Sequence, residues 1–322
     1  MNTNTTIRSA LFEANNLDNV VTILLATHNG EKYLAEQLES IIQQSYKHWK
    51  IVASDDGSTD NTLSILRDYQ NKLGETRFVI KHGPCQGFCA NFMALARDPS
   101  LDSAYFAFCD QDDRWHSNHL QRALSWLTDN QGTTASLYCG RTRLVNKNGH
   151  YQGESTLRLR TPSFRNALIQ SLAGGNTMVF NTEARNLLIA TGDLPVVSHD
   201  WWIYMLVSGA NGQIKYHRIP SIDYRQHGKN IVGSNVRFRD QFSRLMRMSE
   251  GQLKEWNNTN LESLSQCMNL LTNEHRQTLD AFVAARKKTF FSRCVGVFKS
   301  GVHRQSISGD LGLIAATILG KI

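Results

Sequence analysis

The chain has 322 residues, of which 41% are hydrophobic and 20% charged, a composition typical of a soluble globular protein. This length suits one large α/β domain with an extension, or two domains. The formal net charge of +7 is compatible with anionic substrates, nucleic acid or an anionic membrane surface, and it is too small to select one of them.

No targeting or membrane-spanning segment is visible. The first twenty residues are polar, which argues against a cleavable signal, and no apolar run approaches the roughly eighteen residues that would span a bilayer. The cysteines show no paired zinc spacing, so we expect reduced thiols in a cytoplasmic protein. They are Cys85, Cys89, Cys109, Cys139, Cys267 and Cys294.

After a polar lead-in at residues 1–18, the first half of the chain repeats one pattern four times. A short apolar run, typical of a parallel strand buried on both faces, is followed by a turn and then by apolar residues at helical spacing. The four strand candidates are 20–27, 49–54, 77–80 and 105–109. This alternation predicts a mostly parallel, right-handed, doubly wound α/β sheet with helices on both faces.

The fourth strand candidate runs directly into three carboxylates, the first two being Asp110 and Asp112. In an open α/β sheet, ligands bind at the carboxyl ends of the strands, and side chains two apart on an extended segment point the same way. The pair therefore suits Mg²⁺ or Mn²⁺, which prefer oxygen ligands and often share a site with substrate phosphates. A solvated acidic turn is the alternative, but Asp55 and Asp56 at the second strand end favour a site.

The second half of the chain is less regular, and its elements are expected from turn residues and short apolar runs. We expect strands at 137–145, 173–181 (after a glycine turn) and 213–218, helices from about 182 and from 198, and exposed polar loops at 151–165 and 224–230. From about 236 the pattern becomes helical, polar and basic. We therefore divide the chain into the lead-in, a main domain at 19–235 and a C-terminal helical extension at 236–322.

Five motifs in chain order resemble those of the family 2 glycosyltransferases, which have a GT-A fold and use nucleotide-sugar donors. The resemblance covers roughly residues 20–235. The motifs are Thr27-His28-Asn29-Gly30, Ser54-Asp55-Asp56-Gly57-Ser58-Thr59-Asp60, Gly87 with Asn91, Asp110-Gln111-Asp112, and His199-Asp200. His199 stands where the family carries Glu or Asp. The resemblance implies donor contacts from Thr27, Asn29, Asp55, Asp56, Gly87, Asn91 and Asp110.

Three longer stretches, 108–115, 199–202 and 224–233, resemble bacterial rhamnosyltransferases of surface-polysaccharide assembly, of the O-antigen or capsule type. This resemblance implies dTDP-L-rhamnose as the donor and a saccharide or lipid-linked saccharide as the acceptor. Related members use other sugars, so a different donor on the same fold is the alternative.

The family resemblance also implies inversion at the anomeric carbon by a single displacement. That reaction needs a general base for the acceptor hydroxyl, and Asp200 is the candidate, although Asp is also a common helix N-cap. It needs a cation at the leaving diphosphate, which we assign to Mg²⁺ or Mn²⁺ on Asp112 with Asp110. His227 would complete this shell as a metal ligand or as a hydrogen-bond donor to phosphate, assisted by the charge of Arg225 or Lys229; an ordinary surface histidine is the alternative.

Four residues are candidates for the acceptor side. Trp201 and Trp202 could form an apolar platform for a sugar, although packing of an amphipathic helix explains such residues equally well. Gly175 and Asn176 could let the backbone approach the acceptor, and a plain tight turn is the alternative. One of Asp55 and Asp56 could also serve only to cap the following helix.

In the extension, basic residues alternate with Phe and Val, as in Lys287-Lys288-Thr289-Phe290-Phe291-Ser292-Arg293. This pattern favours either peripheral contact with an anionic membrane, which would suit a lipid-linked acceptor, or a helical pack against the main domain. Four further arginines in the same extension are Arg237, Arg239, Arg244 and Arg247.

Three other functions would require different sequence features. A nucleotidyltransferase would carry a glycine-rich loop with basic residues after the first strand, where this chain has only His28-Asn29-Gly30. A non-catalytic nucleotide-sugar-binding module would keep its function without Asp200. A nucleic-acid partner is not expected, because no recognition motif accompanies the positive charge.

Overall fold

The computed structural model describes residues 19–130, 134–227 and 252–322. The predicted lead-in, Lys229 and the four arginines between Arg237 and Arg247 lie outside these ranges. None of the helices in the described ranges combines the length and apolar character that crossing a bilayer requires. All six cysteines, each within the described part of the chain, carry free thiols.

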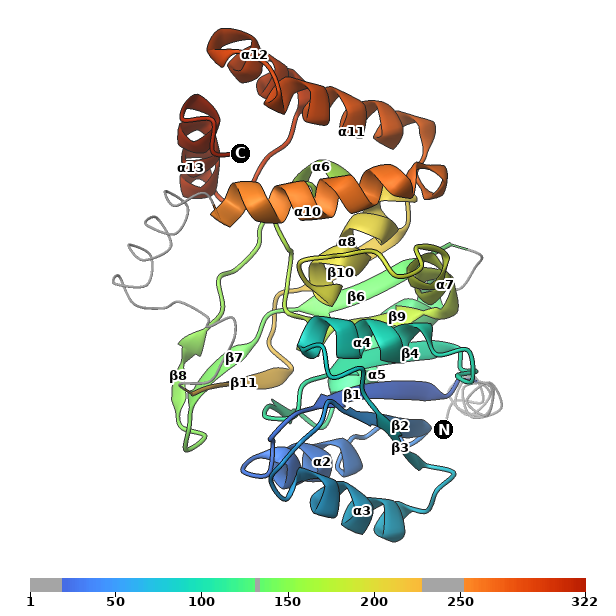
Figure 1. Cartoon of the computed structure of the whole chain (residues 1–322). Helices are drawn as coiled ribbons and strands as arrows, with labels where there is room; N and C mark the ends of the chain where they lie inside the picture. Colours follow the sequence, from blue (N-terminus) through green and yellow to red (C-terminus); the bar gives the residue numbers. More distant parts are fainter. Residues whose placement is uncertain (1–18, 131–133, 228–251) are drawn as a thin grey trace, which may run out of the picture.

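A seven-stranded sheet forms the centre of the molecule (Figure 1). In spatial order its strands are β10 (Gln213–His217), β6 (Ser136–Gly140), β9 (Val179–Asn181), β4 (Tyr105–Cys109), β1 (Val21–Thr27), β2 (Trp49–Asp55) and β3 (Phe78–His82). β4, β1, β2 and β3 pair in parallel, as the repeated strand–helix pattern predicts. β9 is antiparallel to both of its neighbours, β4 and β6, so the sheet is mixed at that point.

Helices cover both faces of this sheet, because successive residues of each strand point to opposite sides. Leu24 of β1 belongs to the hydrophobic cluster that includes residues of α4 (Phe88–Arg97), α7 (Thr182–Ala190) and α8 (His199–Gly209). Its neighbours Ile23 and Leu25 belong to the cluster that includes residues of α2 (Leu34–Ile42), α3 (Thr62–Leu73) and α5 (His119–Asp129). The predicted doubly wound, mostly parallel sheet with helices on both faces and a C-terminal helical extension is confirmed.

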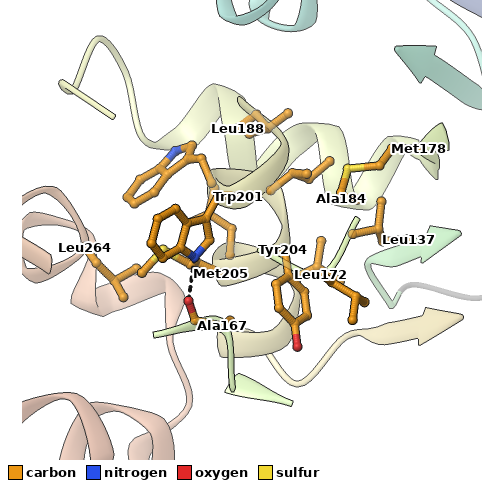
Figure 2. Packing of buried hydrophobic residues seen from close by; sticks show 14 of the residues in the cluster. Leu137, Ala167, Leu172, Met178, Ala184, Leu188, Trp201, Tyr204, Met205 and Leu264 are labelled. Atoms are coloured by element: carbon orange, nitrogen blue, oxygen red, sulfur yellow. Dashed lines mark hydrogen bonds between the residues drawn. The ribbon is translucent and has the colours of Figure 1, made fainter. Parts of the chain in front are cut away.

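The C-terminal extension packs partly on the main domain through the same core. α10 (Gln252–Gln266) contributes Leu264, which lies near Trp201 of α8 in Figure 2, and α11 (Asn273–Arg286) contributes Phe282. The short helix α6 (Phe164–Ala167) packs against α8. α12 (Phe290–Ser300) and α13 (Ile307–Ile318) follow at the end of the molecule farthest from α2 and α3 (Figure 1).

A second sheet of four short strands was not predicted. Its order is β5 (Arg114–Trp115), β11 (Ile222–Gln226), β7 (Arg143–Asn146) and β8 (Tyr151–Glu154). Two of these strands fall where we expected loops, at 151–154 and 224–226, and the single strand expected at 137–145 is divided between β6 and β7. Strands this short have few residues in which an alternating pattern can be seen, so their pairing is decided by contacts with distant residues.

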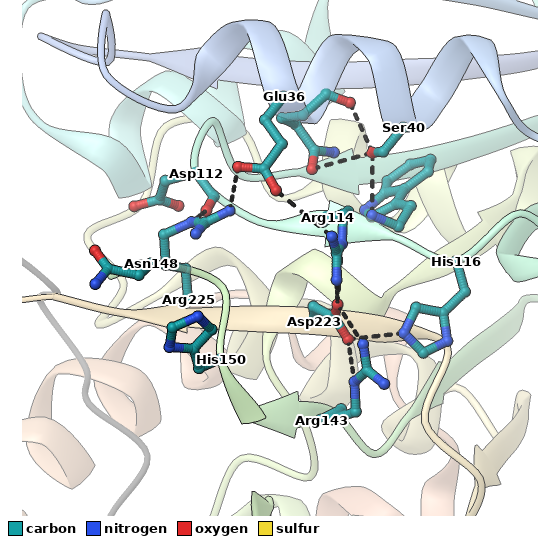
Figure 3. A network of polar contacts seen from close by, with 12 residues as sticks. Glu36, Ser40, Asp112, Arg114, His116, Arg143, Asn148, His150, Asp223 and Arg225 are labelled. Carbon is teal, nitrogen blue, oxygen red and sulfur yellow. Dashed lines mark hydrogen bonds and ion pairs between the residues drawn. The ribbon is translucent and has the colours of Figure 1, made fainter. Parts of the chain in front are cut away.

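The side chain of Asp223 holds three of these strand segments together (Figure 3). It is completely buried and accepts hydrogen bonds from Arg114 Nε at 3.0 Å, Arg143 Nη2 at 2.7 Å and His116 Nε2 at 2.8 Å. Burial alone would raise the pKa of Asp223, but the hydrogen bonds from His116, Arg143 and Arg114 outweigh it and hold the pKa well below its usual value. The second sheet is therefore joined by one buried, multiply paired carboxylate.

We expect Asp223→Asn to lower the free energy of unfolding by about 2 kcal/mol at pH 7, because two arginines lose their buried counter-charge. A carboxyl with a lowered folded pKa stabilises the fold above its unfolded pKa of about 3.9, and this contribution is lost as the pH falls towards the folded pKa. The difference between the variant and the wild type should therefore shrink below about pH 4. Urea unfolding across this range measures it. Asp68→Asn, at an exposed position on α3, is the control, and an equal effect of the two variants would contradict the assignment.

Candidate active site

Asp55, the last residue of β2, connects the ends of the first two strands. Its carboxylate accepts hydrogen bonds from Thr27 Oγ1 at 2.9 Å, from the Ser58 amide at 2.8 Å and from Ser58 Oγ at 2.6 Å. The residue is 3% exposed. Two of the predicted donor residues, Thr27 and Asp55, thus lie in direct contact, and together they fix the loop that follows β2.

Asp56 fixes the conformation of the loop before α4, as Asp55 does for the loop after β2. Its two oxygens accept hydrogen bonds from the Cys85 amide at 2.6 Å and from the Gly87 amide at 2.8 Å. Gly87 has φ of 90°, a conformation that favours glycine. Asn91, one turn into α4, is buried and exchanges hydrogen bonds with Ser54. The predicted residues Asp56, Gly87 and Asn91 therefore lie at one loop, directly beside Asp55.

Gln111, between the two aspartates of the Asp-x-Asp motif, is a site residue that the sequence reasoning missed. Its side-chain amide accepts from the His28 amide and donates to the His28 carbonyl, both at 2.9 Å. A Cβ atom at Gly30 would collide with Gln111 Oε1, which explains the glycine. The adjacent Asn29 has φ of 48° and accepts from the Thr59 amide at 2.8 Å. The loops after β1, β2 and β4 are thereby joined into one surface.

Carboxylates from two distant parts of the chain meet beside this surface. Burial, and then the neighbouring charges of Asp112 and Asp200, raise the pKa of Asp110 well above its ordinary value. The residues that the structure describes donate no hydrogen bond to the Asp110 carboxylate. Asp110, Asp112 and Asp200 were predicted as separate metal and catalytic residues, and the fold brings their charges within interacting distance.

Arg225, in β11, and His227, directly after β11, both contact Asp112. His227 Nε2 lies 2.7 Å from Asp112 Oδ2, and its ring stacks on Tyr33 with 5.3 Å between centroids. Arg225 is 2% exposed, donates to the Asp112 carbonyl at 3.0 Å, and pairs with Glu36 at 2.6 Å (Figure 3). The second sheet therefore delivers two nitrogen-bearing side chains to the Asp-x-Asp motif.

Asp113, the third acid of the run, fixes the position of the Asp-x-Asp motif through buried hydrogen bonds. It is completely buried, and it accepts hydrogen bonds from Asn176 Nδ2 at 2.5 Å and from the Arg225 amide at 3.1 Å. Burial and the neighbouring charges of Asp112 and Asp110 raise the pKa of Asp113 well above its usual range. The sequence predicts Asn176 on the acceptor side, whereas in the structure its side-chain amide donates to Asp113.

Asp200 lies in the first turn of α8 and is not the helix N-cap, which is Ser198. One carboxylate oxygen, Oδ1, accepts from Ser198 Oγ at 2.5 Å and from the Trp201 amide at 2.7 Å. The other oxygen, Oδ2, receives no hydrogen bond from the described residues. Asp200 is thus held by one oxygen while the other is available to accept a proton.

His199, directly before Asp200, is enclosed by aromatic rings. Its ring stacks on Phe92 at 4.0 Å and meets Phe108 edge-on at 4.6 Å between centroids. Neither ring nitrogen has a hydrogen-bond partner among the described residues. Burial lowers the pKa of His199 to about 4, so the ring is neutral at pH 7. A Cβ atom at Gly175 would collide with Nε2, so Gly175 makes room for this ring.

The two tryptophans of α8 pack in the core and offer no platform for a sugar in this structure. Trp201 is 5% exposed and donates from Nε1 to the Ala167 carbonyl at 2.6 Å (Figure 2). Trp202 is completely buried. Packing therefore explains both tryptophans, and the expected sugar platform is wrong. Residues of α6 and α10 cover the apolar face of α8 that carries these side chains.

No cluster of three or more His, Cys, Asp or Glu side chains within the described ranges is arranged to hold a metal ion by itself. The fold nonetheless gathers two carboxylates and one imidazole, those of Asp110, Asp112 and His227, at the end of β4. Mg²⁺ is often bound by one or two carboxylates together with substrate phosphates. This donor set is compatible with a cation that is completed by a diphosphate.

Comparison with known families matches residues 22–188 to the model described as glycosyl transferase family 2. The match covers the motifs at Asp55, Asp56, Asp110 and Asp112, whose geometry is given above. The chain belongs to glycosyl transferase family 2.

Curated relatives of this family member include the dTDP-rhamnosyl transferase RfbG of Shigella flexneri. It is 30% identical over 238 residues, which cover 69% of this chain and 78% of RfbG. A second relative is the Escherichia coli enzyme WfaP, a UDP-Glc:alpha-D-GlcNAc-diphosphoundecaprenol beta-1,3-glucosyltransferase. It is 32% identical over 112 residues, which cover 34% of this chain and 41% of WfaP.

Among solved structures, residues 1–349 of S. aureus TarS in complex with UDP-GlcNAc are similar to this chain with a TM-score of 0.57. The comparison covers 94% of this chain and 88% of that one, at 15% sequence identity. This likeness supports the fold of the family 2 transferase described here. The chain is accordingly a transferase with a GT-A fold, and the residues predicted for the donor lie mostly in the loops at the carboxyl ends of β1, β2 and β4.

We expect Gly175→Ala to lower the free energy of unfolding of this transferase by about 2 kcal/mol, because the new methyl group would collide with the buried His199 ring. In a His199→Ala background the space is open, and the same substitution should cost less than about 1 kcal/mol. Urea unfolding of the two single variants and the double variant measures the coupling. Equal costs of Gly175→Ala in both backgrounds would show that His199 does not explain the glycine.

Proposed function

We propose that the chain is an inverting, metal-dependent glycosyltransferase that moves L-rhamnose from dTDP-L-rhamnose to a saccharide or lipid-linked saccharide in bacterial surface-polysaccharide synthesis. The observation that carries the donor assignment is the 30% identity to a dTDP-rhamnosyl transferase over 69% of the chain. The diphosphoundecaprenol acceptor in the name of WfaP supports the lipid-linked alternative for the acceptor.

The donor nucleotide would bind at the joined loops after β1, β2 and β4 and before α4. Thr27, Asn29, Asp55, Asp56, Gly87 and Asn91 line or support these loops. Because Asp55, Asp56 and Asn91 are buried and hydrogen-bonded within the protein, they act chiefly by fixing loop shape. Backbone groups of the same loops would then contact the base and ribose, as exposed backbone near Asn29 and Gly57 allows.

Asp200 is the proposed general base. Its Oδ1 accepts hydrogen bonds from Ser198 and the Trp201 amide. These bonds orient the carboxylate and leave Oδ2 without a donor from the described residues. Asp200 lies at the start of α8 and beside Asp110, at the edge of the sheet where the proposed donor loops meet. The proton of an acceptor hydroxyl would pass to Oδ2 as the oxygen attacks the anomeric carbon from the face opposite the diphosphate.

Asp110 and Asp112, with His227 beside them, would hold Mg²⁺ or Mn²⁺. Burial, and then the neighbouring carboxylates of Asp112 and Asp200, raise the pKa of Asp110, and a divalent ion would relieve the repulsion between these carboxylates. A bound cation would neutralise the charge that develops on the leaving diphosphate. Arg225 keeps this segment in position through its contacts with the Asp112 carbonyl and Glu36.

Two alternatives remain distinct from this proposal. One is the same mechanism with another donor sugar, and the UDP-Glc in the name of the relative WfaP supports it. The other is a module that binds a nucleotide sugar without turnover. The position of Asp200 beside Asp110, with Oδ2 receiving no hydrogen bond from the described residues, favours catalysis over the second alternative.

The proposal predicts release of dTDP from dTDP-L-rhamnose when membrane glycolipid is supplied as acceptor. Asp200→Asn should lower kcat by at least about a hundredfold and leave dTDP affinity unchanged, because the base is lost and the nucleotide loops are untouched. Asp193→Asn, at an exposed position seven residues earlier, is the control. Faster turnover of another nucleotide sugar in the same panel would reject rhamnose, and full activity of Asp200→Asn would reject the base.

Metal dependence is a separate prediction. With Mn²⁺ present, titration calorimetry should give at least about tenfold tighter dTDP binding than with EDTA, because the cation links the diphosphate to Asp112. Asp112→Asn should remove most of this difference, whereas the control Asp68→Asn should keep it. Equal dTDP affinity in Mn²⁺ and EDTA would contradict the metal assignment while leaving the donor loops unaffected.

A further inference from the structure

α12 exposes large apolar side chains along one side. Phe291, Val295 and Phe298 recur at intervals of four and three residues and are 75%, 40% and 87% exposed. Phe290 beside them is 56% exposed. This spacing places the three residues on one face of a helix. The opposite side carries the buried Val297.

α13 repeats the arrangement. Ile307, Leu311, Ile314 and Ile318 follow the same helical spacing and are 77%, 63%, 55% and 46% exposed. The other side of this helix is buried through Leu313, Ala316 and Thr317. We call the exposed apolar residues of both helices, Phe291, Val295, Phe298, Ile307, Leu311, Ile314 and Ile318, the docking face.

Specific contacts hold these two helices in place. Arg293 of α12 donates hydrogen bonds to the carbonyls of Thr317 at 2.8 Å and Ile318 at 3.1 Å, at the end of α13. Arg160, in the segment after β8, pairs with Asp310 of α13 at 2.7 Å. The exposure of the docking face therefore belongs to a packed arrangement, and within the described residues no other element covers it.

The charge around the docking face is strongly positive. Residues 287–322 contain six Lys or Arg residues and one acidic residue, Asp310, which Arg160 already pairs. Lys287 and Lys288 precede α12, and Lys299 lies near its end, all three exposed. An apolar face flanked by exposed lysines matches the interfacial region of an anionic bilayer, where the apolar side chains enter the acyl boundary and the amines meet phosphates.

We propose that the docking face binds the surface of an anionic phospholipid bilayer, with α12 and α13 lying in the plane of the interface. The helices have 11 and 12 residues, too short to span a bilayer, for which about 20 are needed. A second copy of this chain fits less well, because its docking face would bring the same positive charge. The inference rests on this surface alone and does not require the proposed donor or acceptor.

Sedimentation with vesicles tests the proposal. The full chain should bind vesicles of phosphatidylcholine mixed with phosphatidylglycerol, and bind vesicles of phosphatidylcholine alone more weakly. Phe291→Ser combined with Phe298→Ser should reduce partitioning by at least about tenfold, since two apolar anchors are lost. Both side chains are mostly exposed, so the fold should be retained, which circular dichroism verifies.

Two matched variants complete the experiment. Ile189→Ser with Ile219→Ser removes exposed apolar side chains from α7 and from the segment after β10, and it should bind vesicles like the wild type. Lys287→Glu with Lys288→Glu should weaken binding to the anionic vesicles and reduce its salt dependence. Failure of the wild-type chain to bind anionic vesicles would overturn the proposal, as would undiminished binding of the double Phe variant. A dimer in light scattering that the Phe variant dissociates would assign the face to a second copy instead.

Discussion

The mutual repulsion of carboxylates at one edge of a parallel sheet is the constraint on which the rest of this structure depends. Asp55 ends β2 and Asp56 follows it, while Asp110, Asp112 and Asp113 follow β4 and Asp200 lies in α8. Buried or half-buried negative charges so close together are costly unless donors or cations compensate them. Much of the irregular structure can be understood as that compensation: the loops around Asp55 and Asp56 supply amide and hydroxyl groups, and the second sheet supplies Arg225 and His227.

This constraint separates supporting carboxylates from reactive ones. Asp55, Asp56, Asp113 and Asp223 are nearly or completely buried, and donors from the protein occupy both of their oxygens. Asp110 and Asp200 differ, because one or both oxygens receive no hydrogen bond from the described residues. A carboxylate whose two oxygens are both occupied by donors from the protein has no oxygen left for a cation, whereas one with an unoccupied oxygen can still bind a cation. The proposed chemistry therefore falls on Asp110, Asp112 and Asp200, and the other acids shape the surface around them.

The main sheet, and the meeting of Asp55, Asp56, Asp110 and Asp112 at one edge of it, could be predicted from the sequence, because both depend on local patterns. Each of the first four strands is an apolar run that ends in polar residues, and parallel strand ends meet at one edge whatever the details of packing. The second sheet could not be predicted, since β5, β7 and β11 are joined through Asp223 by residues 80 to 109 positions apart. The roles of Trp201 and Trp202 were wrong for a related reason: helical spacing shows that a face is apolar but not which distant helix covers it. Gln111 and Asn176 were missed or misplaced because amide side chains carry no local pattern that indicates their partners.

The contact between His227 and Asp112 sets a condition on how the proposed site would be loaded. His227 Nε2 is 2.7 Å from Asp112 Oδ2, so this nitrogen cannot also be directed at a metal or a phosphate while the contact persists. If a cation takes Asp112, the imidazole must give up that oxygen, and its nearest use is then a phosphate that the cation has brought to the same place. Tyr33, stacked on the imidazole and beneath the Arg225 guanidinium, keeps the ring near the motif during such an exchange. In this arrangement His227 contacts Asp112 before the donor binds and would serve the diphosphate afterwards, which is the second of the two roles predicted for it from the sequence.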